Sequence, residues 1–163
     1  MICTPYAAAA ALLADLLVEL GNTRGKAPER AAVYPHAEPA IEFCSMLWVG
    51  FRSLKPLDQQ RHCGVWVADL TVGIQRCYPM ENDGGAPPAV FVDSAARDIL
   101  DDAEAVRRAI AEAFEDEQHT VTGWRPVNPM GGSHGSRTDV SVAVAMGQYT
   151  EPLSAMLPGD PRS

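Results

Sequence analysis

Cysteine and histidine are the side chains of this sequence best suited to bind a metal or act as nucleophiles. The four cysteines are Cys3, Cys44, Cys63 and Cys77, without a CxxC pair or a zinc-ribbon spacing. His62 precedes Cys63, and with Cys44 on a neighbouring predicted strand the three could form a metal cluster. Reduced thiols at small buried sites are favoured, because free cysteine packs as a modest hydrophobe. A disulfide between Cys44 and Cys63 is a third alternative in an oxidising environment.

Enzymatic chemistry has little support in the spacing of these residues. Cys63 and His62 are neighbours on a predicted strand, so their side chains point to opposite faces and are badly placed for proton transfer. Ser133 and His134 lack the GxSxG setting of a hydrolase. The glycine-rich stretch 131–136 lacks the lysine and the strand-to-helix context of a phosphate loop. We therefore predict no catalytic residue, no metal site and no cofactor.

Composition places the chain among ordinary globular proteins. It has 163 residues, of which 47% are hydrophobic and 21% charged, enough for one domain with a proper core. The formal net charge is −8 and the pI is near 4.9. Such a charge argues against a protein that neutralises phosphates with a basic surface. It would suit a surface past which nucleic acid slides without sticking.

The stretch from Cys63 to Cys77 has the clearest structural pattern. Apolar residues occupy every second position, a period of two that predicts a strand with one buried face. Its length predicts the central strand of an antiparallel sheet, bent near Gly73. The alternating residues are Trp66, Ala68, Leu70, Val72 and Ile74.

Two amphipathic helices are expected. Residues 5–14 resemble the apolar part of a signal peptide, but no basic residue precedes them and acidic residues soon follow. A packing helix capped by Thr4 and ending at Gly21 fits better. A second helix is predicted over 94–115, with an apolar side and an acidic side that we interpret as solvated. Asp101 or Asp102 could cap a fresh start, which would divide this helix in two.

The fold class predicted from this order of elements is α+β. A mostly antiparallel sheet of about four or five strands is packed by an N-terminal helix and a central helix, with a C-terminal hairpin and an extended tail. We expect a single domain over 1–146 and a flexible arm over 147–163. The other expected segments are an edge strand at 32–34, a strand at 41–49, a polar link at 52–62, and a hairpin of 120–127 and 137–146 around a flexible bend at 128–136.

Four phrases carry a family resemblance. They are CSMLWVG (44–50), CGVWVADLTVGIQRCYP (63–79), DDAEAVRRAIAEAF (101–114) and GWRPVNPMGGSHG (123–135). Together with the order of elements, they resemble a small neck protein of long-tailed actinobacterial phages. That group is similar to the tail terminator family, whose ring caps the tail tube and joins it to the head connector.

The resemblance implies a structural virion protein, not an enzyme. It implies a homohexameric ring at the head–tail junction, assembled in the host cytoplasm, with tail tube protein on one face and stopper or connector proteins on the other. DNA would pass through the lumen without sequence-specific binding, and no membrane would be involved. Alternatives are another neck component, a stopper or a mostly helical adaptor, and a cysteine- or metal-dependent enzyme.

The interface of such a ring is expected at the sheet edges, the acidic helix and the glycine-rich bend. Within the bend, the residues assigned to the contact with a neighbour or with the tube are Met130, Gly131, Gly132, Ser133 and His134. We expect deletion of residues 130–136 to leave a folded monomer that no longer assembles.

Overall fold

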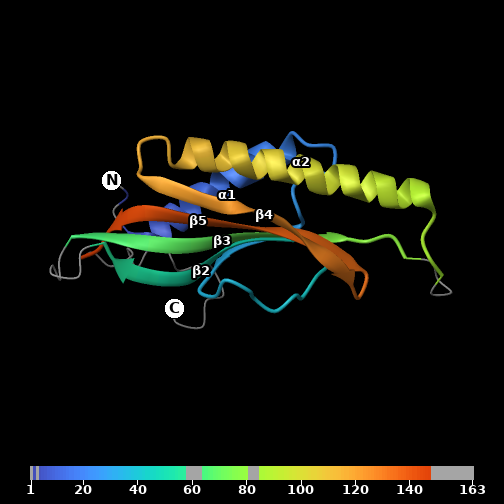
Figure 1. The fold of residues 1–163 in the computed structure, drawn as a ribbon, viewed down its shortest axis with the longest axis horizontal. Helices are drawn as coiled ribbons and strands as arrows, with labels where there is room; N and C mark the ends of the chain where they lie inside the picture. The colour runs from blue at the N-terminus through green and yellow to red at the C-terminus, as the bar shows by residue number, and fades with distance from the viewer. Residues whose placement is uncertain (1, 3, 58–63, 81–84, 148–163) are drawn as a thin grey trace, which may run out of the picture.

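Two helices lie on one face of a five-stranded sheet in this computed structural model, which describes residues 2, 4–57, 64–80 and 85–147 (Figure 1). The sheet order is β1-β2-β3-β5-β4, with β1 parallel to β2 and every other pair antiparallel. The predicted α+β class is confirmed, while the predicted arm lies outside the described residues beyond Gly147. The elements are α1 (Pro5–Gly21), β1 (Arg30–Tyr34), β2 (Met46–Pro56), β3 (Val65–Cys77), α2 (Ala89–Ala113), β4 (His119–Met130) and β5 (Ser133–Ala145).

Helix α1 begins and ends where the sequence predicts. The hydroxyl of Thr4 accepts a hydrogen bond from the backbone N–H of Ala7 at 3.1 Å, and Pro5 occupies the first turn. Both features satisfy or remove N–H groups that have no partner inside a helix. The buried residues recur at helical spacing along one stripe: Ala8, Ala9, Leu12, Leu16 and Leu20.

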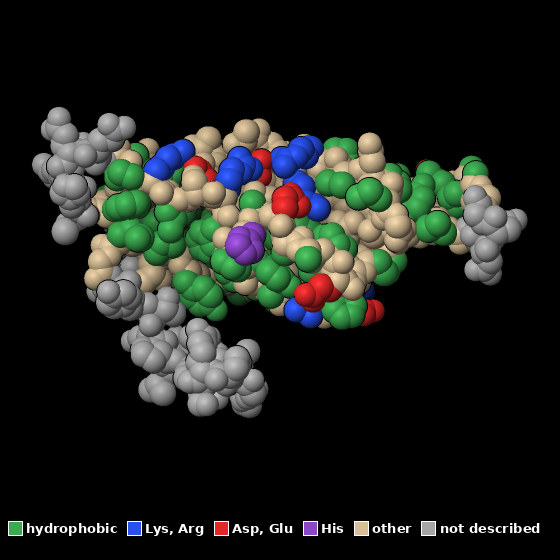
Figure 2. Space-filling view, turned by 90° about the horizontal axis from the view of Figure 1, so that it is seen from below, with side chains coloured by type: hydrophobic (Ala, Val, Ile, Leu, Met, Phe, Trp, Pro, Cys, Tyr) green, Lys and Arg blue, Asp and Glu red, His purple; other side chains and the backbone are tan. Residues whose placement is uncertain are grey.

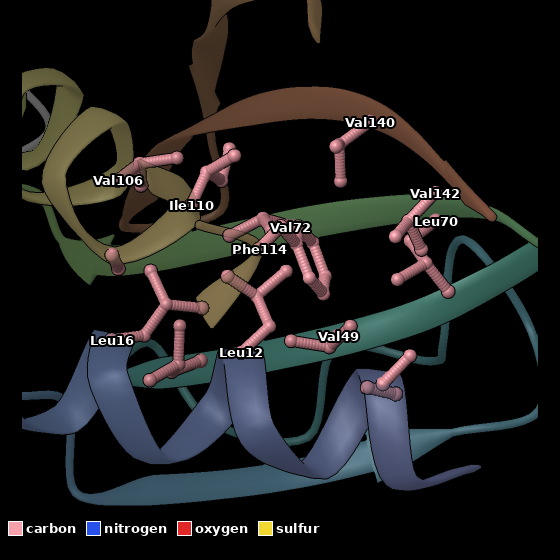
Figure 3. Close-up of a cluster of buried hydrophobic side chains, with 14 of the residues drawn as sticks. Leu12, Leu16, Val49, Leu70, Val72, Val106, Ile110, Phe114, Val140 and Val142 are labelled. Atoms are coloured by element: carbon pink, nitrogen blue, oxygen red, sulfur yellow. The ribbon is translucent and has the colours of Figure 1, made fainter. Parts of the chain in front are cut away.

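The hydrophobic core lies between the helices and the sheet. Alternate residues of β2, β3 and β5 point toward the helices, as the period of two predicts. Figure 3 shows Val49, Leu70, Val72 and Val140 meeting the leucines of α1 and the side chain of Phe114. Phe114 follows the last residue of α2 and is fully buried, so it fixes the end of that helix against the sheet.

The opposite face of the sheet is partly covered by the connection between β1 and β2. This connection, residues 35–45, runs below the sheet in Figure 1. The backbone carbonyl of Ala37 accepts a hydrogen bond from the indole of Trp48 at 2.9 Å, and Glu38 pairs with Arg137 at 2.9 Å. A β-carbon on Gly50 would lie 2.0 Å from the carbonyl oxygen of His36, so glycine permits the close crossing.

The predicted strand at 41–49 is therefore wrong at its start. Ile41 and Phe43 belong to the crossing connection and are exposed, whereas β2 begins at Met46 and continues to Pro56. Residues 52–56 of the predicted polar link form the second half of β2 instead, and residues 58–62 lie outside the described part of the chain. β3 is thirteen residues long, and residues 53–56 pair with it after a bulge at Phe51/Ser53. The backbone groups of the long strand thus obtain partners along its length.

Helix α2 is one continuous helix that starts five residues before the predicted 94. The break expected near residues 101 and 102 does not occur. Phe91 and Val92 donate backbone hydrogen bonds to the carbonyl of Pro88, which precedes the first turn. Proline suits this position because its own N–H is not needed there.

Trp48 is fully buried against a glycine on the neighbouring strand. Trp48 and Gly73 are directly paired between β2 and β3, and a β-carbon on Gly73 would lie 2.1 Å from two atoms of the indole ring. The guanidinium of Arg137 stacks over the other side of the indole, 4.4 Å from the ring centroid. Gly73 thus makes room for the indole ring of Trp48, whereas the sequence analysis predicted a bend in the strand at this residue.

We predict that Gly73→Ala destabilises the protein by about 1–3 kcal/mol, because the new methyl group overlaps the Trp48 ring and forces it to move. Gly21→Ala is the matched control, since no atom lies within 4 Å of the added methyl group at the end of α1. Urea unfolding at equilibrium measures both variants. A Gly73→Ala protein as stable as the control would contradict the packing of Trp48 on this glycine.

Candidate interaction surfaces

The glycine-rich bend is a tight two-residue turn. Gly131 and Gly132 have φ values of +60° and +79°, the left-handed conformation that suits a β-hairpin turn. Residues 133–136, predicted as part of a flexible bend, belong to β5 and are buried. A β-carbon on Gly135 would lie 2.0 Å from the carbonyl oxygen of Ile74, so this glycine serves close strand packing.

Only part of the predicted contact loop is accessible. Met130 is 81% exposed and Gly131 is also exposed, whereas Ser133 and His134 are buried. The ring of His134 packs edge-on against Tyr78, with 4.9 Å between centroids. Burial, and then the nearby Arg76, lowers the pKa of His134 below its ordinary value. Deleting residues 130–136 would remove the first four residues of β5, so we expect this deletion to disturb the sheet as well as any assembly.

The structure joins Cys44 to Cys77 by a disulfide, with Cα atoms 4.6 Å apart. This bond corrects the favoured interpretation that Cys44 and Cys77 are reduced, and it also excludes the alternative of a bond between Cys44 and Cys63. In an antiparallel pair the start of one strand meets the end of the other, and the pairing of Met46 with Gln75 places Cys44 opposite Cys77. His62 and Cys63 lie outside the described residues. Among those that are described, no group of three metal-ligating side chains is found.

A buried ion pair fixes α2 on the sheet. Both carboxylate oxygens of Asp102 accept hydrogen bonds from the guanidinium of Arg76 on β3, each at 2.6 Å. Arg76 also donates to the carbonyls of Gly25 and Lys26 in the segment after α1, at 3.0 and 2.9 Å. Burial raises the pKa of Asp102 above its ordinary value, and Arg76 opposes that rise. The sequence analysis treated Asp102 only as a possible helix cap, so it missed this contact.

An apolar groove of about 400 Å³ opens between α2 and the edge strand β4. Five strands spaced by about 4.8 Å span about 24 Å, whereas two helices packed about 9 Å apart cover about 18–20 Å. The side of β4 that faces the helices therefore stays open beside α2. The residues that line the groove are Ala103, Val106, Arg107, Ile110 and Ala111 of α2, His119, Val121 and Trp124 of β4, and Thr138 of β5.

One polar atom in this groove has no partner. The indole N–H of Trp124 is buried and makes no hydrogen bond within the described part of the chain. A buried donor without an acceptor is costly, and native proteins seldom leave one. An incoming segment that supplies an acceptor would satisfy it.

The backbone edge of β4 is irregular. Bulges interrupt its pairing with β5 at Val121/Gly123 and at Val127/Met130, and two prolines, Pro126 and Pro129, remove N–H groups from the strand. Bulges and prolines are the devices by which proteins prevent open-ended strand addition at a sheet edge. A partner would therefore bind β4 through side chains in the groove more readily than by extending the sheet.

The sheet face opposite the helices carries a row of basic side chains with acidic ones between them (Figure 2). Asp139 accepts hydrogen bonds from Thr71 and Arg125, each at 2.8 Å, and pairs with Arg52. Burial disfavours the charge on Asp139, but the hydrogen bonds from Arg52, Arg125 and Thr71 outweigh it and lower its pKa. This carboxylate therefore stays ionised at neutral pH and cross-links the strands.

Asp69 has a similar environment on the same face. It accepts hydrogen bonds from Ser141 at 2.5 Å, Ser53 at 2.6 Å and Lys55 at 2.9 Å. Burial opposes its ionisation, but these three contacts prevail and lower the pKa of Asp69 to about 2. Such a group is too weak a base for proton abstraction near neutral pH. Its contacts join β2, β3 and β5.

Comparison with known proteins does not assign this chain to a family. No protein-family model matches this sequence, and no curated protein matches it either. In the part of the chain that the structure describes, no helix is long and apolar enough to cross a membrane.

We predict that Asp102→Ala lowers the free energy of unfolding by about 3–5 kcal/mol, because it leaves the buried Arg76 without its counter-charge. Asp101→Ala, at the exposed neighbouring position, is the control and should change little. Thermal and urea unfolding give the comparison. Equal stability of the two variants would show that the Arg76–Asp102 contact does not hold α2 in place.

A second prediction concerns Asp69 and pH. The folded pKa lies below the unfolded one, so the charge stabilises the fold above about pH 5 and this stabilisation is lost as the pH falls toward 2. Asp69→Asn should therefore cost about 2 kcal/mol near pH 6 and much less near pH 2. Urea unfolding at both pH values tests this, with Asp93→Asn at an exposed ion pair as control. An equal loss at both pH values would contradict the role of the charge.

Proposed function

We propose that this protein is a structural component of the neck of a long-tailed phage, a tail terminator that assembles into a ring between tail tube and head connector. The observation that carries the proposal is the order of elements: a helix, a short edge strand, two long strands, a second helix and a hairpin. The family resemblance rests on this order together with four sequence phrases. The hexameric ring and its place in the virion follow from that resemblance.

The β content of the chain supports the terminator over an adaptor. An adaptor of the neck is expected to be mostly helical, whereas five strands form the centre of this molecule. A stopper shares size and symmetry with a terminator, so it is the remaining neck alternative. Binding to tail tube protein, as distinct from connector protein, separates these two roles.

The surfaces available for contact also support a protein that acts by assembly. The groove between α2 and β4 is apolar on both walls, and large exposed apolar side chains occur elsewhere on the molecule. Contiguous exposed apolar surface of this kind marks protein–protein contact sites. A ring needs two different complementary patches on each subunit, because each subunit contacts two neighbours through unlike faces.

The net charge of −8 supports a conduit for DNA. Acidic side chains repel the phosphate backbone, so a lumen lined by them would let DNA slide, whereas basic residues would retain it by releasing counterions. The basic residues of the face opposite the helices pair with carboxylates, as Arg125 does with Asp139 and Lys55 with Asp69. This pairing weakens the attraction between these basic side chains and the phosphates of passing DNA.

Native mass spectrometry at several protein concentrations, with and without the tail tube protein of the same particle, tests the proposal. We expect a discrete six-subunit species, stabilised by the tube protein. Electron microscopy of that species should show a ring with an open centre. A strict monomer that ignores the tube protein at every concentration would refute the terminator assignment.

A further inference from the structure

The first turn of α2 exposes three consecutive large apolar residues. Val90 is 67% exposed, Phe91 54% and Val92 39%. Three successive positions of a helix point in directions about 100° apart, so their exposure means that the turn packs against little of the chain that the structure describes. In Figure 1 this end of α2 extends past the hairpin at the end of the sheet. We call residues 90–92 the apolar knob.

The knob cannot fill the groove of its own chain. Both features lie on α2, the knob in its first turn and the groove along residues 103–111. At a rise of about 1.5 Å per residue, Phe91 and Val106 are about 22 Å apart along one continuous helix. A rigid helix holds them at that separation, so only another molecule can bring a knob to this groove.

Knob and groove match in chemistry. Both are apolar, and each is bordered by charge of opposite sign: Asp93 follows the knob, and Arg107 lies on the rim of the groove. Each has an exposed partner on its own helix, Arg97 at 2.8 Å from Asp93 and Glu104 at 2.8 Å from Arg107. Exposed ion pairs contribute little stability, so these residues can exchange partners at low cost. The unpaired indole N–H of Trp124 gives the groove a donor for an incoming acceptor.

We propose that the apolar knob of one copy binds in the groove between α2 and β4 of the next copy. The inference rests on the proposed ring and names its subunit contact. Knob and groove are different surfaces, so the contact is heterologous, and each bound subunit still offers one free knob and one free groove. A heterologous contact closes into a ring when the rotation between successive copies divides a full turn evenly, and the proposed ring requires such a rotation.

Two single substitutions test the contact from opposite sides. Phe91→Glu places a charge on the knob, and Val121→Glu places one in the groove; both positions are exposed, so the fold should persist. Leu100→Glu is the matched control, an exposed apolar residue of α2 outside both surfaces. Circular dichroism checks folding, and sedimentation velocity and native mass spectrometry measure assembly of the full chain. We expect each single variant to associate more than about tenfold more weakly, and the control to assemble normally.

Mixing the two variants gives the sharper result. Val121→Glu retains a knob and Phe91→Glu retains a groove, so an equimolar mixture can form one intact contact and then stops. We expect a one-to-one heterodimer with nothing larger. Normal assembly of either folded single variant, or no heterodimer in the mixture, would overturn the knob-in-groove contact.

The outcomes also separate this contact from the proposed function. If wild-type protein forms open chains without a closed ring, and both substitutions abolish them, the contact holds and the ring is refuted. If wild-type protein forms a six-subunit ring that neither substitution weakens, the ring holds and its contact lies elsewhere.

Discussion

The buried pair of Arg76 and Asp102 is the interaction on which the arrangement of the layers depends. It joins the end of the central strand β3 to the middle of α2, and Arg76 also holds two backbone carbonyls after α1. A buried pair of opposite charges stabilises a fold little more than well-packed apolar residues would. Removing one partner is strongly destabilising, because it leaves the other charge buried and unpaired. The pair therefore acts mainly by specifying where α2 lies. Because the groove is the space between α2 and β4, its shape depends on this pair together with the buried Phe114 at the end of α2.

Sheet width is the second constraint. Two helices do not span five strands, so one strand remains beside them without cover. The uncovered strand is β4, whose bulges and prolines discourage sheet extension while its side chains remain available. The edge of β4 thus hinders association by strand addition but leaves association through its side chains possible. Such a bias toward side-chain contact favours finite assemblies over fibres.

Much of the fold could be predicted from local patterns. The cap at Thr4 and the alternation along β3 depend only on neighbouring residues, so the local sequence is sufficient to predict them. The wrong predictions concern contacts between residues that are distant in the sequence. Asp102 was interpreted as a possible helix cap, and only the position of Arg76 explains its burial. Residues 41–45 of the crossing connection were predicted as the start of a strand, because the stretch 41–49 is apolar on both faces.

The candidate site was predicted least well, for a related reason. Glycines at 131–135 suggested flexibility, whereas Gly135 is required by the close approach of the Ile74 carbonyl. The apolar knob cannot be identified from the sequence, because an exposed valine cannot be told from a buried one before the packing is known. The Cys44–Cys77 pairing, by contrast, could have been derived from antiparallel register alone, since the strand ends that meet are set by the direction of the chain.

The bond between Cys44 and Cys77 closes a covalent loop that contains β2 and β3. A protease cut anywhere between these two cysteines would leave one molecule, with both pieces still tied at the end of the sheet. The cut would become visible only after reduction. The disulfide therefore keeps the two pieces covalently joined, and in a reducing compartment this covalent link would be lost.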